Sequence, residues 1–464
     1  MSLAASTHIE RILSSVITGI DKGQLKTGKR LSSIRAAALE YGVSKNTVAE
    51  AYDRLVALGY VEGRPGSGYY VAPTRRPAAR ALPGHVTEAI DLVSLLREQL
   101  HQHYAVRVGD GRPPAAWTDG SELGKHLRNM GTRAGHDIAY GYGDPLGYPP
   151  LRELIAMSLA ERAIQCSAEQ VLMTQGANHA LDLVVRHYVA PGDAVLVDSP
   201  GYYPLFGKLA LAQARLVGVR RTPDGPDLED LAARAAASRA KLFFTQSLAH
   251  NPTGGSLSLG TAHRVLQIAA RHDLTIIEDD PFADVLPAAS PRLAALDQLE
   301  RVIYVGSLSK TLSASLRVGY LAASAERVQA LTDLKMVTCI STSDHTERGL
   351  YHLFAGGHYR RHLQRLKQRI ERARVKAVGH LERMGARLFC TDTGGYYLWL
   401  ELPESLDEHA LVREAAEHGI FLAAGSVFLP QRQAAPPTLR VNIAYADDSR
   451  FLDFMRRKLA GASY

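Results

Sequence analysis

The segment Val305-Gly-Ser-Leu-Ser-Lys310-Thr-Leu-Ser-Ala-Ser-Leu-Arg317-Val-Gly319 places one lysine among small hydroxylic residues, with no acidic residue beside it. The apolar run Arg301–Val305 leads into it and predicts a buried strand, so we expect Lys310 just beyond a strand end. A lysine amine in such surroundings can form a Schiff base with a carbonyl group. A single lysine is more often an ordinary surface residue, so other parts of the sequence must decide between the two interpretations.

Short apolar runs alternate with helical patterns on either side of this segment. Four of these runs are Ala194–Val197, Lys241–Thr245, Leu274–Glu278 and Arg301–Val305. The alternation predicts an α/β fold, a mostly parallel sheet with helices on both faces. The C-terminal part contains fewer and more amphipathic strands, including Tyr396–Leu400 and Leu439–Ile443, which are typical of a smaller α+β domain.

Further residues supply what a carbonyl cofactor with a pyridine ring and a phosphate group requires of a protein. Asp279 ends the run Leu274–Glu278, at the edge where open α/β sheets bind ligands, and its carboxylate can hold a ring nitrogen protonated. A phosphate can be held by a guanidinium group, by hydroxyls and by amides at a helix N-terminus. The candidates are Ser307, Arg317, Gly176, Ala177 and Asn178 for the phosphate, Asn251 for the ring's phenolic oxygen, and Tyr202 for the ring face. Taken one at a time, such residues are more often helix caps, turns or surface residues.

In order and spacing these residues resemble fold-type I aminotransferases of classes I and II, over roughly residues 120–450. The motifs that carry the resemblance are Tyr142…Gly147, Gly176–Asn178, Pro200–Tyr202, Asn251-Pro-Thr-Gly254, Asp279, Ser307-Leu-Ser-Lys310 with Arg317, and Leu439-Arg440. The resemblance implies pyridoxal 5′-phosphate (PLP) as the cofactor, Lys310 as its catalytic Schiff-base lysine, and the roles given above for the other candidates. It also implies that Tyr142 reaches the phosphate of a partner subunit in a homodimer, and that Arg440 binds the carboxylate of a substrate or effector.

One position departs from that family pattern. Enzymes of this fold usually carry a tyrosine two or three residues after the aspartate, where it hydrogen-bonds the ring's phenolic oxygen. Here Asp279 is followed by Asp280-Pro-Phe282-Ala283, and a phenylalanine ring cannot donate that hydrogen bond. We therefore expect PLP binding without efficient transamination, and the sequence leaves open a residual aminotransferase half-reaction.

The first 72 residues predict a separate small domain. An amphipathic helix around Ile9–Ile20 is followed by a second helix that Gly42 can end, and Ser44 can cap a third, from Lys45 to Leu58. Two short strands then flank the turn Arg64-Pro-Gly-Ser-Gly68. Two helices joined by a tight turn and followed by a hairpin form a winged helix-turn-helix, whose recognition helix enters the DNA major groove.

The basic charge of the chain is concentrated in this small domain. Residues 1–80 hold twelve of the 54 Lys and Arg and six of the 47 Asp and Glu, so they carry six of the seven net positive charges. Such a concentration is expected of a module that binds a polyanion, although charge alone also fits a solvated basic surface.

The module resembles the GntR family over roughly residues 8–71. The resemblance implies contacts with double-stranded operator DNA at Arg35, Ser44, Lys45, Asn46, Thr47 and the wing around Gly66. Ser32 and Lys45 stand where the family usually has proline and arginine, and a lysine cannot contact a base with the bidentate geometry of arginine.

We expect three segments along the chain: a winged helix-turn-helix at 1–72, a linker rich in Pro and Arg at 73–90, and a PLP-binding body at 91–464. The body is expected to contain a large subdomain at about 140–345 and a small one at about 346–464. The cysteines Cys166, Cys339 and Cys390 are scattered singly, which predicts no metal site and suits a reducing cytoplasm. No run of eighteen apolar residues occurs, so no membrane insertion is expected.

Both resemblances on one chain, in this order, are the arrangement of the MocR-type subgroup of GntR regulators. It implies a transcription regulator in which PLP, or a small amine or amino-acid effector that forms an aldimine with it, changes DNA binding by the winged helix. The alternative is a working aminotransferase with an appended DNA-binding domain, which Lys310, Asp279 and Arg440 favour and Phe282 disfavours. In a third interpretation the body is only a dimerisation scaffold.

Overall fold

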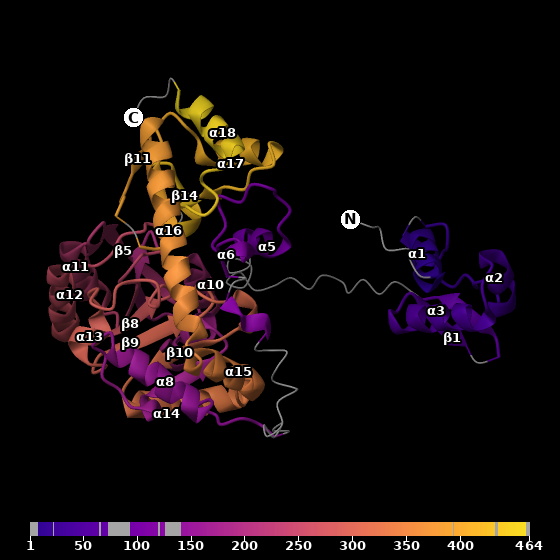
Figure 1. The fold of residues 1–464 in the computed structure, drawn as a ribbon, viewed down its shortest axis with the longest axis horizontal. Helices are drawn as coiled ribbons and strands as arrows, with labels where there is room; N and C mark the ends of the chain where they lie inside the picture. Colours follow the sequence, from indigo (N-terminus) through magenta and orange to yellow (C-terminus); the bar gives the residue numbers. More distant parts are fainter. Residues whose placement is uncertain are drawn as a thin grey trace. The chain divides into compact units, whose positions relative to one another are not determined.

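The structure is a computed structural model, and it describes residues 8–21, 23–64, 66–72, 93–118, 121–125, 141–392, 394–431 and 435–460. The chain divides into two compact units, Met1–Leu82 and Pro83–Tyr464 (Figure 1). The predicted linker at 73–90 lies outside the described residues, so the domain boundaries given above stay predictions.

The N-terminal unit has the predicted order of helices followed by a hairpin. Its elements are α1 (His8–Asp21), α2 (Ile34–Tyr41), α3 (Lys45–Ala57), β1 (Val61–Arg64) and β2 (Gly68–Val71). Gly42 adopts a left-handed conformation with φ 66° and ends α2, and the Ser44 hydroxyl accepts a 3.1 Å hydrogen bond from the Thr47 amide at the start of α3. The apolar sides of the helices and strands close over one core that contains Ile12, Val16, Leu31, Val48, Leu55, Val61 and Val71.

The C-terminal unit is built around a mixed sheet of eight described strands in the order β3-β10-β9-β8-β7-β4-β5-β6. The bounds of these strands are β3 (Val171–Thr174), β4 (Ala194–Ser199), β5 (Arg215–Thr222), β6 (Gly225–Pro226), β7 (Leu242–Thr245), β8 (Thr275–Asp280), β9 (Val302–Ser307) and β10 (Gly319–Ala322). Strands β5, β4, β7, β8 and β9 are parallel, whereas β10 is antiparallel to both of its neighbours. The parallel strands therefore end at one common edge of the sheet.

Helices cover both faces of this sheet, as the sequence predicts (Figure 1). On one face the core includes residues of α8 (Pro149–Ala160), α11 (Leu228–Ser238), α12 (Leu259–His272), α13 (Leu293–Asp297) and α15 (Asp344–Ala355). On the other face it includes residues of α9 (Ala177–Tyr188), α10 (Tyr203–Leu211) and α14 (Ala325–Cys339). The strands between them are buried along almost their whole length because neither face meets solvent.

A long helix, α16 (His358–Arg383), leads from the large sheet to a smaller one (Figure 1). The small sheet is antiparallel where its register is described, in the order β11-β12-β14-β13, with bounds β11 (Arg387–Leu388), β12 (Tyr397–Glu401), β13 (Ala423–Ala424) and β14 (Thr438–Asn442). Its core is shared with α17 (Glu408–Glu417) and α18 (Ser449–Leu459). The remaining described elements are α5 (Ser94–His101), α6 (Ala115–Thr118), η2 (Ala168–Gln170), η3 (Ala314–Leu316) and η4 (Gly425–Phe428).

The predicted large α/β part and smaller α+β part are thus confirmed. The reversal of β10 follows directly after the Lys310 segment, because the chain turns back through η3 to pair Gly319 with Ser307. Among the described helices, none has the length and apolar character needed to cross a membrane.

Candidate functional site

A cavity of about 580 Å³ lies at the common edge where the parallel strands end. It collects residues from segments far apart in the sequence, which only the sheet brings together. The predicted residues in its lining are Ala177, Asn178, Tyr202, Asn251, Asp279, Ser307, Lys310, Arg317 and Arg440. A volume of this size fits a cofactor with a small ligand beside it.

Lys310 follows β9, and its amine donates a hydrogen bond to the backbone carbonyl oxygen of Gly111. The hydroxyl of Tyr397 donates to the same carbonyl oxygen at 2.9 Å, and the hydroxyl of Tyr396 donates to the Lys310 carbonyl at 2.8 Å. The lysine is therefore held from both sides, by its amine and by its own backbone. Gly111 and Tyr397 also line the cavity.

Asp279 is the last residue but one of β8 and is 7% exposed. Its Oδ2 accepts a 2.6 Å hydrogen bond from the side-chain amide of Gln246, whereas Oδ1 has no hydrogen-bond partner among the described residues. Burial raises the pKa of this carboxyl to about 6, and the charge of Asp280 adds to the rise against the opposing effects of Gln246 and Lys310. A buried acceptor without a donor fits the protonated nitrogen of a pyridine ring.

Gln246 links Asp279 to a second candidate, since its side-chain oxygen accepts a 2.7 Å hydrogen bond from the backbone N–H of Asn251. The backbone of Gln246 is fixed in turn by a buried ion pair between Asp198 and Arg221, with 3.0 Å between their charged atoms. The Gln246 amide donates to Asp198 at 3.1 Å, and its carbonyl accepts from Arg221 at 2.7 Å. The ion pair thus sets the position of a residue that touches two parts of the site.

The N-terminus of α9 and Arg317 form an anion-binding end of the cavity. Gly176 precedes α9 with φ 79°, and a Cβ atom built on it would lie 3.0 Å from Nη2 of Arg317. That guanidinium donates a 2.8 Å hydrogen bond to the carbonyl of Gln175, while Ser307 Oγ accepts one of 3.1 Å from the Ser309 amide. The Gly176 amide donates to the Thr174 carbonyl at 2.8 Å, so it is not available for a ligand, contrary to the sequence prediction. The amides of Ala177 and Asn178 at the start of α9, together with the guanidinium, suit a phosphate group.

Arg440 lies on β14 and is 1% exposed. Its guanidinium donates to Asn251 Oδ1 at 3.0 Å and to the Gly109 carbonyl at 2.7 Å, and its carbon lies 4.9 Å from the centre of the Tyr397 ring and 4.8 Å from that of Phe428. Nε has no hydrogen-bond partner among the described residues. A buried guanidinium with donor capacity left is suited to a carboxylate ligand.

Three aromatic residues that the sequence singles out differ in their relation to the cavity. Burial and the charge of Asp279 raise the pKa of Tyr202, which lines the cavity as expected. Tyr142 is 81% exposed and does not line it, and its role towards a partner subunit stays a prediction. Phe282 is fully buried and packs edge to face on Tyr396 and Tyr397, with ring centres 5.2 and 5.8 Å apart, so it supports the cavity wall from behind.

Sequence reasoning missed Gln246, Gly111 and Tyr397. Gln246 follows the predicted strand Lys241–Thr245 directly, so the rule that singled out Asp279 at the end of the neighbouring strand could have found it. Gly111 acts through its carbonyl oxygen, which every residue type possesses, so no residue type predicts its role. Tyr397 falls inside the run Tyr396–Leu400, where apolar alternation hides a functional hydroxyl.

In the N-terminal unit the predicted DNA-contacting residues lie at the start of α3, before it and in the hairpin. Arg35, Ser44, Lys45, Asn46 and Gly66 are exposed, and Thr47 is half-buried. The Ser44 hydroxyl also lies 2.8 Å from that of Thr47, so both residues take part in the helix cap. The contacts with DNA stay a prediction.

Comparisons with known proteins agree with both halves of the chain. The model of aminotransferase class I and II matches residues 110–457, and that of the bacterial regulatory proteins of the gntR family matches residues 8–71. The chain is 27% identical to the uncharacterized HTH-type transcriptional regulator YdfD of Bacillus subtilis, over 92% of this chain and 90% of that protein. It is 29% identical to the probable rhizopine catabolism regulatory protein MocR of Rhizobium meliloti, over 86% of this chain and 82% of that protein.

Solved structures resemble the C-terminal unit. LysN, an alpha-aminoadipate aminotransferase of Thermus thermophilus complexed with N-(5′-phosphopyridoxyl)-L-leucine, has a TM-score of 0.72 and 27% identity, with 81% of this chain and 97% of that chain covered. The kynurenine aminotransferase of Pyrococcus horikoshii has a TM-score of 0.72 at 22% identity, with 83% and 96% covered, and supports the fold.

These findings define a helix-turn-helix transcriptional regulator with an aminotransferase-like body of fold type I. The chain belongs to the class I and II aminotransferase family and, with its GntR domain, has the composition of the MocR-type regulators. Pyridoxal 5′-phosphate is the cofactor that this family implies, and the unpartnered Asp279 oxygen and the anion-binding end of the cavity fit it.

Proposed function

We propose that this chain is a homodimeric cytoplasmic transcription regulator whose DNA binding is controlled at the PLP cavity. PLP itself, or a small amine or amino acid that replaces Lys310 at the cofactor, would be the signal. The observation that carries the proposal is that Lys310, the buried Asp279 with one free oxygen, and Arg440 all face one cavity on a chain that also carries a winged helix. When bound, PLP supplies a carbonyl carbon that reacts reversibly with amines.

Each side chain of the cavity has a task of its own. Lys310 would hold the cofactor covalently through its amine, which here donates to the Gly111 carbonyl. Asp279 would hold the protonated ring nitrogen through Oδ1, while Gln246 donates to Oδ2. Arg317, Ser307 and the amides of Ala177 and Asn178 would bind the phosphate, whereas the Gly176 amide already donates to the Thr174 carbonyl at 2.8 Å.

Arg440 would select among amines. Its guanidinium has an unused donor in a buried place, so an amine that carries a carboxylate gains an ion pair there and a simple amine does not. Asn251 is oriented by Arg440 so that its amide nitrogen is left to donate to the ring's phenolic oxygen. The predicted signal is therefore an amino acid or a related amino compound.

Control of DNA binding requires that the signal binds one state of the protein better than another. A tenfold change in operator affinity needs about 1.4 kcal/mol of such a difference. A ligand that changes the partner of Lys310 and pairs with Arg440 can provide this difference, because both residues contact segments of the large and the small sheets.

The test is an operator-binding assay with the full chain. DNA sites are first selected from a random double-stranded library, and affinity is then measured without PLP, with PLP, and with PLP plus a panel of amino acids and amines. We expect at least one of these additions to change the affinity severalfold, and Lys310→Ala to abolish the change while keeping DNA binding. An affinity that stays constant under every addition would refute control at this cavity.

The second candidate function is aminotransferase activity, which the joint presence of Lys310, Asp279 and Arg440 supports. Phe282 opposes it, because no hydroxyl stands at that position to tune the cofactor. Steady-state transamination with a panel of amino acids separates the two: turnover above about 1 per second, as in evolved enzymes, would favour the enzyme. A body that serves only as a scaffold would show no absorbance from bound PLP, in the native chain or in Lys310→Ala.

A further inference from the structure

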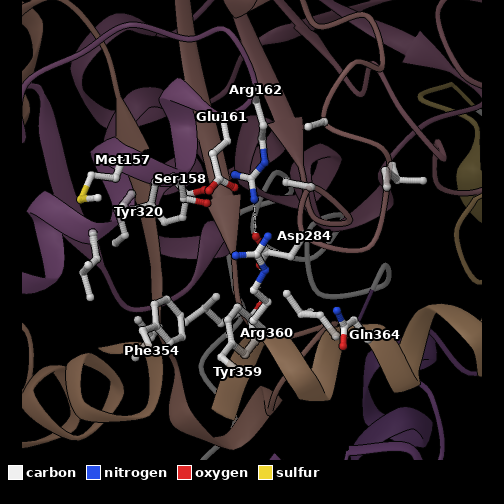
Figure 2. A pocket seen from close by; sticks show the side chains of 18 of the residues that line it. Met157, Ser158, Glu161, Arg162, Asp284, Tyr320, Phe354, Tyr359, Arg360 and Gln364 are labelled. Carbon is white, nitrogen blue, oxygen red and sulfur yellow. Dashed lines mark hydrogen bonds and ion pairs between the residues drawn. The ribbon is translucent and has the colours of Figure 1, made fainter. Parts of the chain in front are cut away.

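A second pocket, of about 560 Å³, lies between α8 and α16 (Figure 2). It shares no lining residue with the PLP cavity. Leu308 lines this second pocket, whereas its neighbours Ser307 and Ser309 line the PLP cavity, so the two lie on opposite sides of the segment that leads to Lys310. None of the roles proposed above uses this pocket.

The charged side chains that line the second pocket carry more positive than negative charge. Arg162 and Asp284 form an ion pair with 2.5 Å between their charged atoms, and both side chains are nearly buried. Arg360 and Lys367 lie seven residues apart on one face of α16, and neither forms an ion pair among the described residues. Figure 2 shows Arg162 and Arg360 extending from opposite sides towards Asp284.

One further acid, Glu161, lines the pocket and forms no ion pair among the residues that the structure describes, so two unpaired cations face one unpaired carboxylate. The excess of positive charge favours an anionic ligand. The exposed ends of Arg360 and Lys367 are long and flexible, and both can reach a carboxylate at the pocket mouth.

Much of the remaining lining is apolar or aromatic. The residues of this kind include Leu154, Met157, Leu308, Val318, Phe354 and Leu363. Met157 is 66% exposed, although its helix, α8, packs on the large sheet. A large apolar side chain is thus left uncovered. An anion with an apolar body would cover this surface and meet the cations at once.

We propose that this pocket binds a small organic carboxylate with an aromatic or branched aliphatic body, and that its occupancy is transmitted to Lys310. Binding here goes beyond the proposed control by PLP and does not depend on it. Only the transmission rests on the bound cofactor.

A short chain of hydrogen bonds connects the pocket with Lys310. The Tyr359 hydroxyl donates to Asp284 at 2.5 Å and lies 2.7 Å from the hydroxyl of Thr311, the residue after Lys310. On the next turn of α16, His362 lies 2.7 Å from the Thr311 carbonyl. A ligand that shifts Asp284 or α16 therefore acts on the backbone that carries the Schiff-base lysine.

The protein's own linker is a poor occupant, because residues 73–90 contain Arg75, Arg76, Arg80 and no acid apart from Glu88. Those arginines would meet Arg360 and Lys367 with like charge. The sign of its charge therefore separates a carboxylate ligand from the linker and from other basic segments as occupants of this pocket.

The test uses the full chain loaded with PLP and three carboxylates: phenylacetate, 3-phenylpropionate and 4-methylvalerate. Phenylacetamide is the uncharged match for the first. Saturation-transfer NMR and calorimetry are expected to detect binding of at least one of these carboxylates to the native chain. The double variant Arg360→Gln/Lys367→Gln is expected to weaken this binding about tenfold, as loss of charged hydrogen bonds does. Arg372→Gln, an exposed residue of the same helix outside the pocket, is expected to leave binding unchanged.

Equal binding of phenylacetamide, equal binding by the double variant, or no binding by any carboxylate up to about 10 mM would overturn the site. Unchanged thermal melting shows that the variants are folded, since glutamine is a good helix former at exposed positions. Transmission is read from the absorbance of bound PLP during the titration. We expect a shift that Tyr359→Phe removes while binding persists; saturation of the pocket without any shift would overturn the transmission.

Discussion

The guanidinium of Arg440 donates a 3.0 Å hydrogen bond to Oδ1 of Asn251, although 188 residues separate the two along the chain. One residue lies on the small sheet and the other in a loop of the large one. The proposed carboxylate-binding residue therefore also orients the proposed donor to the cofactor ring. This contact couples the two parts of the candidate site.

We expect Arg440→Lys to weaken the binding of amino-acid effectors about tenfold or more, and to lower stability by about 1–3 kcal/mol. A lysine cannot serve Asn251, Gly109 and a carboxylate together, and one of the buried acceptors is left unpaired. Spectral titration of the PLP-loaded protein with amino acids measures the first effect and denaturant unfolding the second. Arg372→Lys, exposed on α16, is the matched control, and an unchanged affinity in Arg440→Lys would remove Arg440 from the effector site.

Asp279→Asn tests the buried carboxyl in the cofactor-free protein. Its pKa is raised to about 6 in the fold, above the ordinary value of 3.8, so the carboxyl costs stability once it ionises. This cost is absent below about pH 4, develops as the pH rises to about 6, and stays constant above, with a size on the order of 3 kcal/mol. Between pH 4 and 7 we expect the native chain to lose stability relative to Asp279→Asn.

Denaturant unfolding at several pH values, without PLP, gives this comparison directly. The same variant is expected to bind PLP more weakly above pH 6, because asparagine cannot pair with a protonated ring nitrogen. Parallel pH profiles of the two proteins would show that Asp279 has an ordinary pKa in the fold.

Gly176→Ala is expected to weaken PLP binding severalfold and to destabilise the protein by about 1–2 kcal/mol. The new Cβ would lie 3.0 Å from Arg317 Nη2 at a left-handed φ of 79°, so both the backbone and the guanidinium that would bind the phosphate are displaced. Gly192→Ala is the control, since its φ of 91° imposes similar backbone strain with no atom within 4 Å of the added Cβ. Equal PLP affinity in the two variants would mean that the approach to Arg317 has no part in phosphate binding.

Lys45→Ala is expected to reduce affinity for selected DNA and to lower the slope of log affinity against log salt by about 1, as the loss of one phosphate contact does. Lys45 is exposed beside the cap at the start of α3. Lys45→Arg is expected to keep the salt slope and to change the preferred base, because arginine can bind a guanine edge with two hydrogen bonds. An unchanged slope in Lys45→Ala would place Lys45 away from the phosphates.

Local sequence patterns predicted much of this fold, and particular elements show where they stop. Ser44 and Gly42 act within one helix turn, so their caps follow from the sequence itself. The strand β10 was not predicted, because its antiparallel place between β3 and β9 depends on how the chain returns after Lys310. Lys310 and Asp279 were singled out by their places beyond predicted strands, and Arg440 by the resemblance to the aminotransferases. The link of Asn251 to Arg440 is a property of packing alone.

The backbone around Gly111 has a consequence for how a change at Lys310 can spread. Asn442 of the small sheet donates to the carbonyls of Asp110 and Arg112, on either side of the Gly111 carbonyl that receives the Lys310 amine. When the Lys310 amine binds elsewhere, the three-residue backbone strip at 110–112 loses the hydrogen bond at Gly111. The carbonyls of Asp110 and Arg112 stay bonded to Asn442 of the small sheet. In chain order this strip follows α5, near the start of the described part of the body, so the covalent state of Lys310 would be registered in the N-terminal segment of the body.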